Sequence, residues 1–588
     1  MRTPSLRRDD RPGLQDLRPP ARYRPAFRLG VLTLAAVVLW SAWPESASRA
    51  PVRARQGMVG STEEHASRAG IEILQQGGNA IDAAVAVGFA LAVTHPAAGN
   101  LGGGGFMLIR FADGRTTAID YREVAPAAAH RDMFLGPDGN PVVERSLVGP
   151  LAAGVPGSVA GMAFAQRKYG RLPLATVVQP AIRLARDGFV VSHALADSLA
   201  RAGDLLGRFP ASTRVFTKQG TPWQAGDRLT QKDLATTLQL IADHGPEAFY
   251  RGPIADLLVA EMERTGGLIT KADLAAYTPV ERTPLIGSYR DYEIVGMPPV
   301  SSGGVALMQA LNILEGWPIG EYGHNSSKTI HLVAEATRRV YADRSEWLGD
   351  PAFFDVPVNG LLSKRYAGML RAQIDPNRAT PSNEVRPGRP ADFGSDQTTH
   401  YSVVDAEGTA VSTTTTINGS YGNGQVVTGA GFLLNNEMDD FSVKPGSPNM
   451  FGLVGGVANQ VEPGKRMLSS MTPTIVARDG RTFLVVGSPG GSRIITTVLQ
   501  VVMNVIDHGM DVQEAVDAPR FHHQWLPDQI RIERQGFPLD VVRNLEAMGH
   551  TVSRQADMGD VHAILIDPKT GLRLGASDPR LDGRTLGY

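Results

Sequence analysis

Short stretches of alternating apolar and polar residues recur in pairs along the chain. The two stretches of a pair are joined by a turn rich in aspartate and glycine. Such pairs predict β-hairpins, and turns of this composition favour two antiparallel strands. The four predicted strand pairs are residues 106–111 with 116–121, 401–404 with 409–416, 474–477 with 482–486, and 561–566 with 572–576. Helical patterns flank these hairpins, so we expect antiparallel sheets with helices on both outer faces.

The helical stretches differ in how their apolar positions are distributed. Residues 80–94 are apolar almost all round and follow Asn79, a favourable N-cap, so we expect a buried helix. Residues 331–348 form a second helix with a charged side that ends in Arg344, which we interpret as a solvated face. The glycine run at 102–105 lacks the lysine of a P-loop and does not follow a strand. It predicts a close backbone approach and no nucleotide site.

The composition of the 588 residues is that of a globular protein, with 42% hydrophobic and 20% charged residues. A net charge of −1 gives no electrostatic reason to expect nucleic acid as a partner. The chain has no cysteine, which excludes thiol catalysis, disulfides and thiolate metal sites. Serine, threonine or a carboxylate must then carry any covalent chemistry. Adjacent His522 and His523 have no carboxylate spaced to complete a metal site, so we interpret them as structural.

The first 48 residues have the pattern of a secretory signal. Residues 1–28 are rich in arginine and proline, residues 29–43 are uncharged, and small residues follow at 44–48. The uncharged run is shorter than the roughly 20 residues that a membrane helix needs. An uncleaved N-terminal membrane anchor is the alternative. Both interpretations predict a periplasmic or secreted protein.

Residues 396–405 have a polar beginning followed by β-branched and aromatic residues, which predicts a strand. Thr398 lies at the edge of this strand. A threonine hydroxyl is inert alone, but it can be activated by its own α-amino group once the chain is cut just before it. The pair Thr398-Thr399 by itself indicates only a strand, so a catalytic role for Thr398 needs the support of other motifs in the chain.

Two later stretches change that interpretation, namely Leu-Ser-Ser-Met-Thr-Pro-Thr at 468–474 and Gly-Ser-Pro-Gly-Gly-Ser-Arg at 487–493. With Thr-Thr-His-Tyr-Ser at 398–402, they resemble the γ-glutamyltransferase (γ-glutamyltranspeptidase) family of self-cleaving N-terminal-nucleophile hydrolases. The resemblance extends from about residue 57 to residue 588. It implies an α+β fold, a four-layer αββα sandwich with two antiparallel sheets between helical layers.

The resemblance also implies self-cleavage between Gln397 and Thr398. Residues 1–48 would then be the targeting segment, residues 49–397 a large subunit, and residues 398–588 a small subunit with the nucleophile at its N-terminus. The two subunits of one precursor would associate as a heterodimer.

In the resemblance, Thr398 attacks the γ-amide carbonyl of a γ-glutamyl donor and holds the glutamyl group as an ester. Its freed α-amine is the general base, because an α-amine titrates near pH 8. Thr416 matches a second threonine that positions the nucleophile, although by itself it is one of four consecutive threonines. Gly490 and Gly491 match two backbone donors to the oxyanion.

A γ-glutamyl donor carries an α-carboxylate and an α-ammonium, so its pocket needs groups of both signs. The residues matched to the carboxylate are Arg122, Ser469 and Ser470. The residues matched to the ammonium are Asn418, Glu437 and Asp440. Asp439 we interpret as a turn or surface carboxylate. Residues 444–452 resemble a lid loop, with Phe451 where the family usually has tyrosine.

These matches imply glutathione and related γ-glutamyl compounds as donors, with water, amino acids or peptides as acceptors and with no cofactor or metal. A cephalosporin or glutaryl acylase of the same fold is the alternative enzyme. Such an acylase does not need to bind an ammonium group, so the presence of Asp440 and Glu437 argues against this alternative. An unprocessed periplasmic binding protein of this fold is the third possibility, and Thr398 with the glycine pair argues against that.

Overall fold

The computed structural model describes residues 48–393 and 405–588. Thr398, the predicted strand 401–404 and almost all of the N-terminal targeting segment lie outside the described residues. Residues Ala50–Tyr588 form one compact unit. Within the described ranges, no helix combines the length and apolar character needed to cross a membrane.

Within the described part of the chain, the larger sheet has seven strands, and every neighbouring pair in it is antiparallel. Its order is β1 (Val52–Ala54), β19 (Arg573–Ser577), β18 (His562–Ile566), β14 (Arg481–Gly487), β13 (Thr474–Arg478), β11 (Tyr292–Gly296) and β10 (Leu285–Tyr289). Two of the predicted hairpins are confirmed here, β13 with β14 and β18 with β19.

Among the described residues, the second sheet has four antiparallel strands. Its order is β12 (Ala410–Thr416), β3 (Gly104–Arg110), β4 (Thr116–Asp120) and β9 (Val280–Arg282). The hairpin of β3 and β4 is confirmed, and β12 is the expected second strand of the hairpin at 401–416. The predicted close approach at the glycine run is also present, because a Cβ on Gly102 would lie 2.1 Å from the carbonyl oxygen of Leu433.

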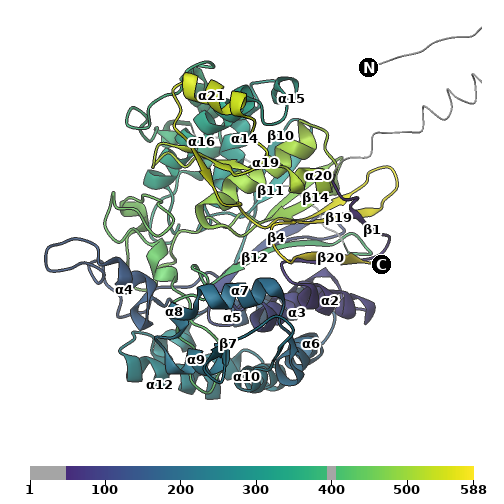
Figure 1. Ribbon diagram of the computed structural model, residues 1–588, viewed down its shortest axis with the longest axis vertical. Coiled ribbons are helices and arrows are strands. Elements are labelled where there is room, and N and C mark those ends of the chain that lie inside the picture. Colours follow the sequence, from purple (N-terminus) through teal and green to yellow (C-terminus); the bar gives the residue numbers. More distant parts are fainter. Residues whose placement is uncertain (1–47, 394–404) are drawn as a thin grey trace, which may run out of the picture. The chain divides into compact units, whose positions relative to one another are not determined.

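The two sheets are stacked, with β12 packed against β14, and helices cover both outer faces (Figure 1). Helices α14 (Gly303–Leu314), α19 (Ile494–Ile506) and α20 (Val512–Asp517) pack on the seven-stranded sheet. Helices α3 (Ala80–Thr94) and α5 (Ser158–Tyr169) pack on the four-stranded sheet. The fold is therefore the predicted α+β, four-layer αββα sandwich.

Each helical layer has its own apolar core against its sheet. Val295, Leu307 and Val498 belong to the core beside the larger sheet, and Phe89 and Ile119 to the core beside the smaller one. The longer helices outside these layers are α2 (Glu64–Gln75), α6 (Leu174–Asp187), α7 (His193–Arg201), α10 (Lys232–His244), α12 (Pro253–Thr265), α16 (Ser327–Trp347), α18 (Lys364–Ala372) and α21 (Leu539–Ala547). Two smaller sheets are β15 (Phe521–His522), β16 (Ile530–Glu533) and β17 (Val552–Gln555), and β2 (Met58–Ser61) with β20 (Arg584–Gly587).

The prediction of a solvated face on residues 331–348 is wrong. In α16 the charged residues Glu335, Arg338, Arg339, Asp343 and Arg344 are buried. Glu335 pairs with Arg338 at 3.2 Å and with Arg339 at 2.8 Å, and Arg338 also pairs with Asp528 from a distant loop. The charges are inside because segments far away in the sequence cover the helix and supply their partners.

Strand ends from both sheets meet at one edge of the stack. β12 ends at Thr416, which is paired with Gly104 at the beginning of β3. β4 ends two residues before Arg122, and β14 ends at Gly487, shortly before the glycine pair. Strand order and register therefore bring together residues that lie hundreds of positions apart in the sequence.

Candidate active site

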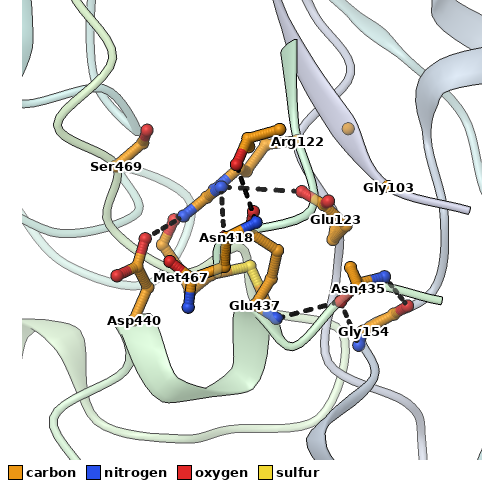
Figure 2. Close-up of polar contacts among 12 residues, drawn as sticks. Gly103, Arg122, Glu123, Gly154, Asn418, Asn435, Glu437, Asp440, Met467 and Ser469 are labelled. Atoms are coloured by element: carbon orange, nitrogen blue, oxygen red, sulfur yellow. Dashed lines mark hydrogen bonds and ion pairs between the residues drawn. The ribbon is translucent and has the colours of Figure 1, made fainter. Parts of the chain in front are cut away.

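Arg122 lies at the centre of a buried group of charges (Figure 2). Only 1% of it is exposed, because it follows the end of β4 directly into the interior. Its Nη1 lies 2.6 Å from Oε2 of Glu437, and its Nη2 lies 2.5 Å from Oδ2 of Asp440. Its Nε donates to the carbonyl oxygen of Met467 at 3.1 Å. The predicted carboxylate-binding cation and the two predicted ammonium-binding acids are thus in direct contact.

Burial and ion pairing act against each other in this group. Burial raises the pKa of Glu437 to about 7, although the charge of Arg122 lowers it. Burial also raises the pKa of Asp440, with Arg122 again opposing the shift. Burial disfavours the charge of Arg122, but the neighbouring carboxylates more than offset this and raise its pKa above the ordinary value. Arg122 therefore stays charged and holds the acids in place.

Two further buried polar residues, Glu123 and Asn435, lie beside this group, and neither was predicted as a site residue. The carboxyl group of Glu123 lies 3.7 Å from Arg122 Nη1, and burial raises its pKa well above the ordinary value. Asn435 donates through Nδ2 to the carbonyl oxygens of Gly102 and Gly154, both at 2.8 Å, and its Oδ1 accepts from the backbone N–H of Glu437 at 3.0 Å. Asn435 thereby fixes the backbone that carries Glu437.

Thr416 and Asn418 form a short turn beside Glu437. The hydroxyl oxygen of Thr416 accepts from the backbone N–H of Asn418 at 2.7 Å, and Asn418 has a left-handed backbone with φ 70°. Its Nδ2 donates to the carbonyl oxygen of Asn436 at 2.9 Å. The neighbouring Thr416 side chain also lowers the pKa of Glu437, after burial, Arg122 and Asp440 have their larger effects. Both residues are thus next to the predicted ammonium site.

Ser469 and Ser470 precede β13 and are buried. The hydroxyl oxygen of Ser469 accepts from the backbone N–H of Met471 at 3.1 Å. That of Ser470 accepts from Nη2 of Arg344 at 3.1 Å. The two serines lie directly after Leu468, whose carbonyl oxygen faces Arg122 Nη2 at 3.5 Å. This places them close to Arg122 along the chain.

Gly490 and Gly491 occupy backbone conformations that only glycine adopts readily, with φ 141° and φ 59°. Gly490 precedes and Gly491 begins the short helix Gly491–Arg493, which leads into α19. A Cβ on Gly491 would lie 2.4 Å from Cδ1 of Phe451, so the lid residue packs directly on the second glycine. The predicted oxyanion donors and the predicted lid are therefore in contact.

The lid, residues 444–452, also contacts the acidic side of the site. Nδ2 of Asn449 donates to Oδ1 of Asp440 at 3.1 Å, and the backbone N–H of Met450 donates to Oδ2 of Asp439 at 2.9 Å. Asp439 is buried and also accepts from the hydroxyl of Ser146 at 2.7 Å, so its interpretation as a turn or surface carboxylate is wrong. Burial raises the pKa of Asp439 to about 6.

The adjacent histidines behave as buried structural residues. His522 contacts the hydroxyl of Thr496 at 2.7 Å and Oε1 of Gln524 at 2.8 Å, and burial lowers its pKa to about 3. His523 faces Asp528 at 3.3 Å, and burial lowers its pKa to about 4. Within the part of the chain that is described, no three histidine or acidic side chains are placed to hold a metal ion.

Comparison with known proteins identifies relatives along nearly the whole chain. The family model described as gamma-glutamyltranspeptidase matches residues 66–588. The glutathione hydrolase proenzyme of Escherichia coli (strain K12) is 57% identical over 540 residues, which covers 92% of this chain and 93% of that protein.

Solved structures agree with this result. A cephalosporin acylase from Bacillus halodurans has a TM-score of 0.82 at 30% identity and covers 93% of this chain and 98% of its own. A chain of the Helicobacter pylori gamma-glutamyltranspeptidase has a TM-score of 0.55 at 45% identity. It covers 59% of this chain but 97% of its own length.

Proposed function

Since the chain belongs to the γ-glutamyltranspeptidase family, we propose that it cleaves the γ-glutamyl bond of glutathione and related compounds. The glutamyl group passes to water or to the amine of an amino acid or peptide. One observation supports this function above others: a buried guanidinium, that of Arg122, faces two acids, the buried Glu437 and the largely enclosed Asp440, whose side chain is 13% exposed. A pocket with positively and negatively charged side chains matches a donor that carries an α-carboxylate and an α-ammonium.

Thr398 is the proposed nucleophile. Its hydroxyl oxygen bonds to the γ-carbonyl carbon, and the hydroxyl proton passes to its own α-amine. The C–N bond of the donor then breaks, and the departing amine takes that proton. The backbone N–H groups of Gly490 and Gly491 stabilise the tetrahedral oxyanion, a contribution of roughly 3–4 kcal/mol for one such donor. Thr416 positions the nucleophile, and water or an acceptor amine releases the glutamyl ester.

Arg122, Ser469 and Ser470 bind the α-carboxylate of the donor in this proposal, and Asn418, Glu437 and Asp440 bind its α-ammonium. In the structure Arg122 is paired with both acids. A zwitterionic donor brings one charge of each sign. Its carboxylate and ammonium can therefore replace the ion pairs between Arg122 and the two acids, and the net charge of the buried site does not change. A donor with only one of these charges leaves a buried group unpaired.

A cephalosporin or glutaryl acylase is the second candidate, because the Bacillus halodurans acylase shares the fold. A glutaryl donor has a carboxylate where the γ-glutamyl donor has carboxylate and ammonium together. The two functions therefore differ in what they require of Asp440 and Glu437. Both acids are at least partly enclosed and contact Arg122, which supports the γ-glutamyl donor.

Replacing Asp440 by alanine distinguishes the two functions. An unpaired donor ammonium in a closed pocket costs on the order of 2–5 kcal/mol, so kcat/KM for a γ-glutamyl anilide should fall by more than about tenfold. The value for a glutaryl anilide should change much less. Asp439→Asn is the matched control, since Asp439 is the adjacent buried acid but contacts the lid and Ser146. If Asp440→Ala keeps its preference for the γ-glutamyl anilide, the recognition scheme is wrong.

Processing and location complete the proposal. Cleavage before Thr398 yields subunits 49–397 and 398–588 that remain associated as a heterodimer. The Escherichia coli relative is named a proenzyme, and the chain of the Helicobacter pylori structure is shorter than this chain. Both observations support cleavage. Residues 1–48 direct export to the periplasm or the medium, which the basic and apolar pattern of that segment supports.

A further inference from the structure

Arg344 lies next to the proposed carboxylate site, although no motif includes it. It is on the last turn of α16, and only 5% of it is exposed. Its Nε donates to the hydroxyl oxygen of Ser302 at 2.9 Å, and its Nη2 donates to that of Ser470 at 3.1 Å. One nitrogen of the guanidinium is thus held by Ser302, and another donates to Ser470, a proposed substrate-binding serine.

Arg344 also lacks the ion pair that buried arginines on the same helix have. Arg338 and Arg339 both contact Glu335, whereas within the described ranges no carboxylate oxygen lies within 4.0 Å of Arg344. Burial lowers the pKa of Arg344 below its ordinary value. Burying a cation without a contacting anion costs free energy, so the surroundings of Arg344 favour the binding of a negatively charged group. The nearest proposed ligand with such a group is the donor carboxylate.

The hydrogen bonds fix the direction of the Ser470 hydroxyl. A guanidinium can only donate, so the oxygen of Ser470 must accept from Arg344. The hydroxyl of Ser302 accepts from Arg344 in the same way, but its proton is used, because it donates to the carbonyl oxygen of Ser469 at 2.6 Å. For Ser470, the described part of the chain offers no acceptor for its proton. That proton is therefore left for an anion on the far side of the oxygen.

We propose that Arg344 is a positioning residue for the donor α-carboxylate: it orients Ser470 so that the hydroxyl donates to that carboxylate, and Ser302 holds Arg344 in place. This role rests on the proposed function, in which Ser470 binds the carboxylate. Arg344 acts through Ser470 and adds positive potential beside Arg122. It therefore affects the binding of donors that carry the α-carboxylate, and not the bond-breaking step at Thr398.

The test compares two donors that differ in this one group. The first is γ-glutamyl p-nitroanilide, and the second is 4-aminobutyryl p-nitroanilide, which keeps the ammonium but lacks the α-carboxylate. Arg344→Lys should raise KM for the first donor by roughly tenfold with little change in kcat, because one hydrogen bond to a charged group is weakened. The affinity for the second, measured as KM or as an inhibition constant, should stay within about twofold.

Two further variants show whether the effect passes through Ser470. Ser470→Ala should raise KM for the γ-glutamyl donor, and adding Arg344→Lys to it should cause little further loss. Arg339→Lys is the matched control, because it alters a buried arginine of the same helix that is paired with Glu335. It should leave the ratio of the two affinities unchanged. Ser302→Ala should show the pattern of Arg344→Lys more weakly, and it serves if the latter does not fold.

The possible failures are distinguishable. If Ser470→Ala does not change KM for the γ-glutamyl donor, the proposed role of Ser470 is wrong. If Ser470→Ala raises that KM but Arg344→Lys does not, the role of Arg344 alone is wrong. Equal losses for both donors, or a full additional loss from Arg344→Lys in the Ser470→Ala background, would also overturn it.

Discussion

Arg122 shows how much of this site depends on single residues. Its guanidinium contacts Glu437 and Asp440 directly and lies 3.7 Å from Glu123. Removing any one partner would leave a buried charge without compensation, which commonly costs more than the ion pair contributes. The most informative substitutions at this scale therefore keep the shape of a side chain and change only its charge.

Glu437→Gln is such a substitution, and it should change the pH dependence of donor binding. Burial raises the pKa of Glu437 to about 7, so the carboxylate is protonated as pH falls below that value. A protonated Glu437 binds the donor ammonium less well, so wild-type kcat/KM should fall by up to about tenfold between pH 8 and pH 6 from this group. Glutamine does not titrate. The ratio of wild-type to variant kcat/KM should therefore rise with pH through about 7.

The pH series needs a donor that does not use this contact. A glutaryl anilide lacks the ammonium, so the same ratio measured with it should be independent of pH. A ratio that is flat for both donors would show that Glu437 does not titrate against the ammonium.

Some residues of the site are predictable from the sequence and others are not. Arg122, Glu437 and Asp440 lie in or beside recognisable motifs, and the structure brings them together. Glu123 and Arg344 carry no such signal, because what makes them unusual is burial by distant segments. Gly104 lies against Glu123, and Ser302 and Ser470 enclose Arg344.

The lid is the element that connects the two halves of the site. Phe451 packs on Gly491, and Asn449 donates to Asp440. The carbonyl oxygen of Phe451 also accepts from Nε2 of Gln524 at 3.1 Å. The loop thus contacts the proposed oxyanion donors, the proposed ammonium site and a buried glutamine at once. Its position should control which molecules reach the glutamyl ester.

Phe451→Tyr adds a hydroxyl to the ring of the lid residue that packs on Gly491. One additional net hydrogen bond of roughly 0.5–1.5 kcal/mol would favour the closed lid by a factor of about two to ten. Water passes a closed lid more easily than a dipeptide does, so the ratio of hydrolysis to transfer should rise at a fixed acceptor concentration. Donor acylation should change little. Product analysis with a dipeptide acceptor measures the ratio, and equal ratios in the two proteins would show that this side chain does not gate the site.

Among the elements, hairpins are predicted better than helix faces. The strands at 106–111 and 116–121 form a local hairpin, so pattern and turn chemistry suffice to predict them. The local pattern of α16 predicts that its charged side faces solvent, because charges usually do. That side is buried, with Arg338 paired both to Glu335 of the same helix and to Asp528 of a distant loop. The partner from the distant loop cannot be predicted from the local pattern.

At the scale of the whole molecule, the layers are predictable and the strand order is not. Hairpins flanked by helices imply stacked antiparallel sheets under helical layers. Nothing in the sequence pattern alone pairs β12 with β3, which lies some 300 positions earlier, or places β11 beside β13. The pairing of β12 with β3 places Thr416 beside Gly104, at the end of the sheet where β4 leads into Arg122.

The central claim is that Thr398, freed by cleavage of the precursor, carries the γ-glutamyl group. Intact-mass measurement of the mature protein, before and after brief exposure to a γ-glutamyl donor and acid quenching, tests it most directly. We predict a fragment that begins at Thr398 and ends at Tyr588, and that gains the mass of one γ-glutamyl group on Thr398. Thr398→Ala should remain one uncut chain without that gain, and Thr398→Ser should cleave slowly. A cleaved Thr398→Ala protein, or a glutamyl group on another residue, would contradict the account.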